Sequence, residues 1–216
     1  MILYKASKAG FLNDVAADRI DDAVAAEYRK AIGRPTGSEF TAWASSLKFM
    51  GAVLDTDEIS DGCTVCIEYM LPIGRSRVDF IIAGKDSSLS DNVVIVELKQ
   101  WTNVKVLEDC DLLEVDYGKR GTLPFIHPSY QAYSYAVTLR EYNECIEQNG
   151  IGIYPCAYMH NYLPSPSSPV SDTSIFPYVD DAPLFTIYDH LRLRSFIREH
   201  VSLPDTEALM DMIDNS

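Results

Sequence analysis

The chain has 216 residues, 47% of them hydrophobic, and a formal net charge of −14 at pH 7. This length allows one domain with a substantial core, and the acidic balance argues against a protein that coats nucleic acid through a basic surface. No stretch approaches the roughly 18 apolar residues of a transmembrane helix, and the N-terminal residues lack the apolar core of a signal peptide. We therefore expect a cytoplasmic chain with no membrane partner, organised as a single domain over residues 1–216.

Residues 1–60 are expected to form a largely helical N-terminal part. Residues 2–4 are typical of a short edge strand, helical patterns cover about 8–17 and 21–32, and a Gly-Arg-Pro sequence ends the second helix. A third helix is predicted to open at Ser38, with apolar residues at a 3-4-3-4 spacing that should face the core. These apolar residues are Phe40, Trp43, Leu47, Met50 and Leu54.

The stretch that carries most information is an aliphatic run from Val93 to Val96 that ends in Glu97, Leu98 and Lys99. Four consecutive Val or Ile residues favour a strand that is covered on both faces. Because side chains alternate along a strand, Glu97 and Lys99 share one face and Leu98 lies on the other. Burying two opposite charges there is costly unless they are paired, solvated or bound to a metal. The end of this strand is therefore either a functional site or a strand that simply reaches solvent.

A hairpin places a second carboxylate beside this strand. Residues 76–84 also read as a strand, and the polar, Ser- and Asp-rich segment after them is typical of a hairpin loop. If the two strands pair antiparallel with Ala83 opposite Val93, Asp79 lies directly opposite Glu97. Because directly opposed side chains are close neighbours, we expect these two carboxylates to interact.

A preceding hairpin extends the row of carboxylates. Residues 64–71 read as a strand, and a turn that contains Pro and Gly leads into the next strand. Pairing the end of that strand with Ser76 places Glu68 opposite Asp79, so three carboxylates are expected on one face of a three-stranded meander. Like charges at such positions are destabilising, so a positive group is expected among them. It would be a divalent cation such as Mg²⁺, which prefers oxygen ligands, or the ammonium of Lys99.

An acid followed one hairpin later by Glu-x-Lys resembles the signature of the PD-(D/E)XK nuclease superfamily. Asp79 supplies the acid and Glu97-Leu98-Lys99 supplies the Glu-x-Lys element, with Val78 in the place of the nominal Pro. The resemblance implies an α/β fold with a restriction-endonuclease-like core, in which a mixed sheet with an antiparallel three-strand meander is flanked by helices. The predicted order of helix, meander, helix and strand is the order that such a core requires.

A second motif resembles one branch of that superfamily. Gln131 and Tyr135, spaced to share one face of a helix, resemble the Gln-x-x-x-Tyr motif of RecB-like exonucleases, which implies that they orient the lysine or the substrate strand. Residues 4–196 are similar to the N-terminal nuclease domain of bacterial nuclease-helicase fusion proteins. The chain contains no Gly-x-x-x-x-Gly-Lys phosphate loop, so a helicase or ATPase partner is expected to be missing or to lie on another chain.

The resemblance implies metal-dependent hydrolysis of phosphodiester bonds, with DNA favoured over RNA as the substrate. Asp79, Glu97 and the backbone carbonyl of Leu98 are expected to hold one or two Mg²⁺ or Mn²⁺ ions. Lys99 is expected to position the attacking water and to offset charge that develops in the transition state. Glu68 is a further candidate ligand on the predicted register alone.

Basic side chains near the proposed site are candidate nucleic-acid contacts. Arg75, Arg77 and Lys105 lie close to the site in sequence, while most of the acidic residues lie elsewhere. His127 is a further candidate for a phosphate or metal contact, although a His before a Pro also serves as a helix cap or packs in the core. We expect weak, metal-dependent binding of nucleic acid by this chain alone.

The catalytic core is expected over residues 61–160, and a C-terminal loop with helices over residues 161–216. Segment 101–120 is irregular and acidic, which predicts either a mobile flap beside the site or an ordinary surface hairpin. The remaining elements are predicted as a helix over about 128–148, strands over 151–160 and 183–188, a Pro-rich loop over 161–174, and helices over 190–200 and 205–213.

The five cysteines favour buried reduced thiols over a zinc or iron–sulfur site. Cys63 and Cys66 are separated by two residues, but Cys145 and Cys156 are too widely spaced to match the clustered cysteines of iron–sulfur nucleases. A strand would also aim the first pair to opposite sides. Reduced thiols are the default in a cytosolic protein.

Two other classes of function remain open. The chain is either an active nuclease, a nuclease fold that only binds nucleic acid or protein, or an acidic mimic of nucleic acid that blocks another protein. The intact pattern of Asp79, Glu97 and Lys99 argues against the idle fold, whereas the net charge of −14 suits the mimic.

Overall fold

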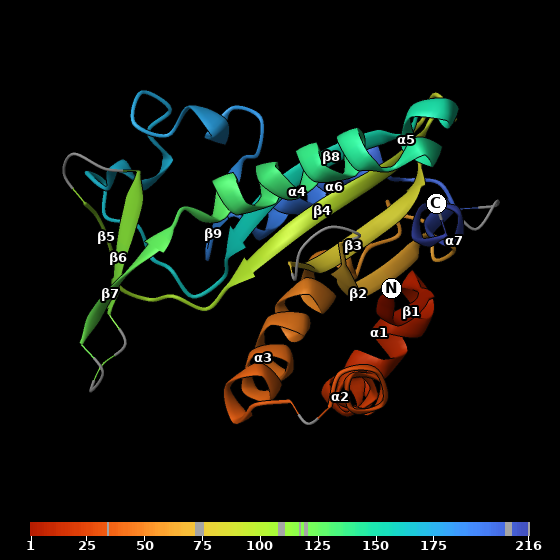
Figure 1. Ribbon diagram of the computed structural model, residues 1–216, viewed down its shortest axis with the longest axis horizontal. Coiled ribbons are helices and arrows are strands. Elements are labelled where there is room, and N and C mark those ends of the chain that lie inside the picture. The colour runs from red at the N-terminus through yellow and green to blue at the C-terminus, as the bar shows by residue number, and fades with distance from the viewer. Residues whose placement is uncertain are drawn as a thin grey trace.

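The fold is taken from a computed structural model of the chain, which describes residues 1–33, 35–71, 76–107, 111–116, 118, 121–205 and 209–215, without the side chains of residues 38, 39, 41 and 42. The protein is mixed α/β. A six-stranded sheet is covered by helices on both faces, and a separate three-stranded sheet stands beyond one end of it (Figure 1). Over the residues just given, no helix is long and apolar enough to cross a membrane.

The large sheet combines an antiparallel half and a parallel half. Its strands are β1 Ile2–Ser7, β2 Thr64–Met70, β3 Arg77–Lys85, β4 Asp91–Lys99, β8 Gly152–Met159 and β9 Leu184–Thr186. They lie in the order β1-β2-β3-β4-β8-β9. The first four are antiparallel neighbours, whereas β8 pairs parallel to β4 and β9 parallel to β8. The predicted mixed sheet with a three-strand meander is therefore confirmed, and the edge strand predicted at residues 2–4 is β1.

The register of both predicted hairpins is confirmed. Ala83 pairs with Val93 across β3 and β4, and the backbone N–H of Leu71 donates to the carbonyl of Ser76 beside the turn between β2 and β3. Side chains of β4 alternate between two cores, one that includes Val94 and Val96 and one that includes Val93 and Ile95. Burial on both faces explains why this strand reads as an unbroken aliphatic run.

Two groups of helices supply these cores. One group covers the face with Val94, and its members are α1 Lys8–Ala16, α2 Ile20–Ala31, α3 Gly37–Leu54 and α6 His190–His200. The other group covers the face with Val93, and its members are α4 Pro128–Tyr142, α5 Glu144–Asn149 and α7 Leu209–Asp214. The apolar stripe predicted on α3 faces the core as expected, with Trp43, Leu47, Met50 and Leu54 buried and Phe40 packed against them.

The helix predicted over residues 128–148 is wrong in one respect, because it is two helices. Asn143 adopts an extended backbone between α4 and α5. Its side-chain oxygen accepts the backbone N–H of Ile146 at 3.2 Å, and its amide donates to the carbonyl of Ile213 at 2.7 Å. Asn is a preferred N-cap residue, so the side chain that ends one helix starts the next.

The segment predicted to be irregular forms much of a second sheet. Its strands are β5 Val104–Val106, β6 Leu112–Asp116 and β7 Thr122–Ile126, all antiparallel neighbours. Leu113 is fully buried in a third core with Tyr162 and Phe176, which belong to the chain after β8. That stretch also holds the 3₁₀ turns η2 Pro169–Ser171 and η3 Pro177–Val179. The prediction of an irregular segment is therefore wrong for the residues of β5 and β6, which pair as antiparallel neighbours, as the predicted surface hairpin requires.

A buried lysine holds the loop between α3 and β2. Lys8 is only 2% exposed, and its ammonium donates to the carbonyl oxygens of Thr56 at 2.7 Å and Ile59 at 2.6 Å. It also forms an ion pair with Asp61 at 3.1 Å. The positive charge therefore sits where the oxygens of this acidic loop converge.

Candidate active site

The predicted acidic and basic residues meet where β3 and β4 leave their shared ladder. The backbone N–H of Leu98 donates to Oδ2 of Asp79 at 2.8 Å, beyond the last ladder pair of this hairpin. Lys99 Nζ forms an ion pair and a hydrogen bond with Oε1 of Glu97. The charge of Asp79 also acts on Glu97. The structure therefore brings together Asp79, Glu97 and Lys99, as the predicted register requires.

Glu97 occupies an unusual position for a carboxylate. It is 0% exposed, and its second oxygen, Oε2, has no hydrogen-bond partner in the described part of the chain. Burial, followed by the neighbouring charge of Asp79, raises the pKa of Glu97 to about 8, against the attraction of the Lys99 ammonium. Because an unsatisfied buried carboxylate oxygen is costly, Oε2 is a place where a proton or a cation would be stabilised.

Lys99 lies between the acids and an aromatic ring. Although burial lowers the pKa of Lys99, the carboxylates of Glu97 and Asp79 raise it more, so the net direction is upward and the group stays an ammonium. Its Nζ also lies 5.5 Å from the ring centroid of Trp101. A cation over an indole face is further stabilised, which fixes the reach of this side chain.

The two residues of the Gln-x-x-x-Tyr motif also belong to this place. Gln131 Nε2 on α4 donates to the hydroxyl oxygen of Tyr135 at 2.6 Å. Burial and then the charge of Glu97 raise the pKa of Tyr135 above its usual range, despite the hydrogen bond from Gln131. The phenol therefore remains protonated and lies within the electrostatic reach of the carboxylates.

Glu68 has partners other than the other two acids. Its backbone has a φ of 56°, and no ladder pair forms at this position with either neighbouring strand. Such a left-handed residue is typical of an interruption in a strand, where a side chain is re-aimed. Glu68 accepts a hydrogen bond from Trp43 Nε1 at 2.8 Å and forms an ion pair with Arg77 at 3.0 Å. The side chain is therefore already neutralised on the α3 side of the sheet.

The expectation of three carboxylates on one face is not met. Over the described ranges, no three His, Cys, Asp or Glu side chains are grouped closely enough to hold a metal ion. The remaining donor set consists of Asp79, Glu97 and the carbonyl of Leu98. Mg²⁺ commonly uses one or two carboxylates and keeps several waters, so this set fits such an ion, and the partnerless Oε2 of Glu97 would supply an oxygen for it.

A pocket of about 200 Å³ opens beside these groups. It is walled by α3 on one side and by the ends of the meander strands on the other. The lining residues are Trp43, Ser46, Leu47, Glu68, Arg77, Asp79, Leu98 and Lys99. The pocket thus combines apolar walls with two of the predicted catalytic groups, Asp79 and Lys99.

The four predicted nucleic-acid contacts have different surroundings. Arg77 is held by Glu68 and lies 5.3 Å from the ring centroid of Tyr28, whereas Arg75 falls outside the described residues. His127 is fully buried: its Nδ1 accepts the backbone N–H of Ser129 at 3.1 Å, and its Nε2 bonds the carbonyl of Val170 at 2.9 Å. Burial lowers the pKa of His127 to about 4, so the ring is neutral. This is the capping role rather than a phosphate contact.

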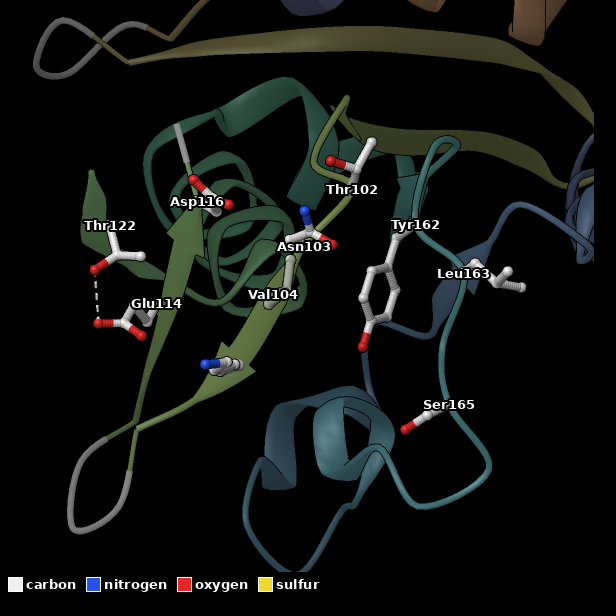
Figure 2. Close-up of a pocket in the computed structure, with 10 residues that line it drawn as sticks. Thr102, Asn103, Val104, Glu114, Asp116, Thr122, Tyr162, Leu163 and Ser165 are labelled. Carbon is white, nitrogen blue, oxygen red and sulfur yellow. Dashed lines mark hydrogen bonds between the residues drawn. The ribbon is translucent and has the colours of Figure 1, made fainter. Parts of the chain in front are cut away.

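Lys105 lies in a separate pocket of about 360 Å³ between the second sheet and the chain after β8 (Figure 2). Glu114 and Asp116 line the same pocket, and Glu114 accepts a hydrogen bond from Thr122 at 2.9 Å. On the opposite wall Tyr162 is buried and its hydroxyl pairs with Ser168 at 2.8 Å. Two carboxylates beside one lysine make this pocket a poor site for phosphate.

The described cysteines lie in different parts of the core. Cys63 and Cys156 belong to the core on the α3 face, whereas Cys66 belongs to the core on the α4 face. Burial raises the pKa of Cys63 and of Cys66 to about 12. Cys145 is partly buried, and Cys110 lies outside the described residues. The predicted buried thiols are confirmed for the three in the cores.

Sequence reasoning missed a chain of polar side chains beside the pocket. Ser46 Oγ lies 2.9 Å from His160 Nε2, and His160 Nδ1 lies 3.2 Å from the side-chain oxygen of Asn161. Gln100 Nε2 donates to Ser46 Oγ at 3.3 Å. One signal was present in the sequence. If the strand over residues 151–160 is paired parallel to β4, His160 follows the partner of Lys99 and lies beside Gln100.

Comparisons with protein-family models, with characterised proteins and with solved structures each found no match. The geometry of the site itself therefore carries the functional argument.

Proposed function

We propose that the chain is a metal-dependent nuclease that hydrolyses phosphodiester bonds, with a restriction-endonuclease-like core and with DNA favoured as the substrate. One observation carries the proposal. Where β3 begins and β4 ends, Asp79 and Glu97 lie side by side with the Lys99 ammonium, and one oxygen of the buried Glu97 has no hydrogen-bond partner within the described residues.

In this proposal each side chain has one task. Asp79, Glu97 and the Leu98 carbonyl would hold Mg²⁺ or Mn²⁺, one ion or two. When bound, such an ion polarises the scissile phosphate and lowers the pKa of a water. Lys99, kept as an ammonium by its two acidic neighbours, holds that water and stabilises negative charge in the transition state.

The Gln-x-x-x-Tyr motif on α4 acts on Glu97 and Lys99. Tyr135 is a protonated phenol that accepts a hydrogen bond from Gln131. The charge of Glu97 raises its pKa and the charge of Lys99 lowers it. We assign this pair to orienting the lysine or the substrate strand. Because the whole chain carries a net charge of −14, a helicase or ATPase partner would supply most of the grip on nucleic acid.

The test is a cleavage assay with plasmid, linear duplex and single-stranded DNA, each with Mg²⁺, Mn²⁺, Ca²⁺ or a chelator. We expect cleavage with Mg²⁺ or Mn²⁺ and none with the chelator. The double substitution Asp79→Ala with Glu97→Ala should abolish both cleavage and the rise in melting temperature that metal produces by linkage. Cleavage that survives the double substitution would remove the proposed site.

A second candidate is favoured by the net charge of −14. An acidic surface can imitate nucleic acid and occupy the binding site of another protein. In that case the chain would bind a basic DNA-binding protein with an affinity that falls steeply with salt, and would cleave nothing under any metal condition. The same cleavage assay therefore separates the two functions.

A further inference from the structure

Beyond the carboxylate–lysine site, the structure contains a hydrogen-bonded chain with fixed proton positions. Asn161 Nδ2 donates to the backbone carbonyl of Gln100 at 3.4 Å. The side-chain oxygen of Asn161 therefore faces His160 Nδ1, at 3.2 Å. Because an amide oxygen only accepts, Nδ1 carries the proton, and Nε2 of the neutral ring is then an acceptor. Ser46 therefore donates its hydroxyl proton to His160 Nε2 at 2.9 Å.

The remaining contact completes the surroundings of the serine oxygen. Gln100 Nε2 donates to Ser46 Oγ at 3.3 Å, so one lone pair of the oxygen accepts that bond while its proton points to the histidine. Ser46 also lines the pocket of about 200 Å³. A hydroxyl whose proton is already held by an imidazole, which a third group in turn orients, is the arrangement of an activated nucleophile.

The histidine is held firmly in this orientation. His160 is 0% exposed, and its ring stacks on Phe49 with centroids 4.4 Å apart and an angle of 23° between the planes. Tyr158 meets the same ring edge-on at 5.8 Å. Burial lowers the pKa of His160, although the hydrogen bond with Asn161 opposes this. The ring is accordingly neutral at pH 7 and able to accept a proton.

The pocket in front of Ser46 has a mixed character. Trp43, Leu47 and Leu98 provide apolar walls, and its charged side chains are of both signs. Such a lining of about 200 Å³ suits a small ester without a large net charge. The cationic donors of Lys99 and Arg77 belong to the same lining, where negative charge on an ester oxygen would be stabilised.

We propose that Ser46 is the nucleophile of a second, acyl-transfer activity toward small carboxylic esters, with His160 as its general base and Asn161 as a positioning residue. Ser46 Oγ attacks the ester carbonyl carbon while its proton passes to His160 Nε2. The bond to the alcohol oxygen then breaks, and the alcohol leaves with that proton. Water hydrolyses the acyl-serine in the reverse sense, releasing the acid and restoring the hydroxyl. The reaction requires no metal and does not depend on the proposed nuclease activity.

The test uses the full chain in the presence of a chelator. A small fluorophosphonate, whose phosphorus forms a bond to an activated serine oxygen as fluoride leaves, is followed by intact mass and peptide mapping. We expect one adduct, on Ser46, together with hydrolysis of p-nitrophenyl acetate. Ser46→Ala should remove both, and His160→Gln should slow labelling by at least about 10².

Ser129→Ala is the matched control. Ser129 is a fully buried serine near His127, and its own hydroxyl has no hydrogen-bond partner among the residues described. This variant should label at the wild-type rate. If His160→Gln fails to fold, Asn161→Ala replaces it, keeping the imidazole but freeing its tautomer, and should slow labelling by at least about tenfold. The proposal is overturned if folded wild type gains no adduct at Ser46, or if the histidine or asparagine variant labels as fast as wild type. Neither result affects the nuclease proposal, which Asp79 and Glu97 carry.

Discussion

Two buried glutamates of the same meander have opposite surroundings. Glu68, on the α3 side, has a partner at each oxygen, because Oε1 accepts a hydrogen bond from Trp43 and Oε2 forms an ion pair with Arg77. Glu97, on β4, has one ammonium partner and keeps an oxygen with none that the described residues provide. Both are acids in strands, and both were predicted as metal ligands. The difference shows that burial of a carboxylate does not by itself indicate a site, because the count of its partners decides whether binding capacity remains.

The comparison also separates two energetic roles. Breaking a pair that is internally satisfied costs stability, since the remaining charge loses its partner. Removing a carboxylate that still has an oxygen without a partner should reduce function, because that oxygen is the atom that would bind a cation. Substitutions at the two positions should therefore affect different measurements.

The largest effect is expected from Glu97→Gln. The substitution keeps the size of the side chain but removes the charge that would bind a cation, so cleavage should fall by on the order of 10³. The rise in melting temperature caused by Mg²⁺ should disappear at the same time. Glu68→Gln serves as the matched control and should retain the metal-induced rise. If both variants lose it equally, the contrast between the two glutamates is wrong.

A smaller effect on cleavage is expected from Lys99→Ala. The lysine touches Glu97 but would not bind the metal, so cleavage should fall by on the order of 10² while Mg²⁺ binding is kept or slightly tightened. Lys99→Arg should rescue poorly, because a planar guanidinium cannot replace a compact ammonium. Calorimetric titration with Mg²⁺ and cleavage rates measure the two quantities separately. Near-native cleavage by the alanine variant would show that the ammonium has no part in the reaction.

Glu68→Gln should act on stability instead. The amide can still accept the Trp43 hydrogen bond, but Arg77 loses its anionic partner, so the free energy of unfolding should fall by about 2 kcal/mol. Chemical denaturation measures this change, with Glu97→Gln as the comparison. A loss of cleavage without a loss of stability would place Glu68 among the functional groups.

The last prediction concerns pH in the metal-free protein. Because the folded-state pKa of Glu97 is raised to about 8, the folded protein holds a proton that the unfolded chain releases at a lower pH. This contribution to stability is complete below the ordinary pKa of a glutamate and is lost as the pH rises through about 8. The slope should approach about 1.4 kcal/mol per pH unit and should be absent from Glu97→Gln. Denaturation midpoints from pH 5 to pH 9 with a chelator would test it, and equal slopes in both proteins would contradict it.

The meander could be predicted because local rules determine it. The aliphatic run identified β4, and the two hairpins fixed a register that placed Asp79 beside Glu97. The position of the Glu68 side chain could not be predicted from the register, because the left-handed backbone of this residue interrupts the alternation of side chains along the strand. The second sheet was missed for a similar reason, since its strands are short and its buried residues pack against a distant part of the chain.

The chain of Ser46, His160 and Asn161 illustrates the other limit of sequence reasoning. Ser46 and His160 lie 114 positions apart and meet only because β8 pairs parallel to β4 and α3 crosses the strand ends. No periodicity carries that information. Parallel pairing requires a crossover connection, and which strands it joins is a property of the whole fold.

The buried Lys8 gives the acidic loop between α3 and β2 a cation of its own. Its ammonium binds two loop carbonyls and Asp61, much as a bound calcium ion would, yet it is covalently attached and cannot be removed by a chelator. Dialysis, added calcium or changes in divalent ions should leave this loop as it is. The oxygens that Lys8 binds are therefore already occupied by a cation when Mg²⁺ is added, and the Glu97→Gln variant shows how much of a metal-induced shift in melting temperature comes from the carboxylates of β3 and β4.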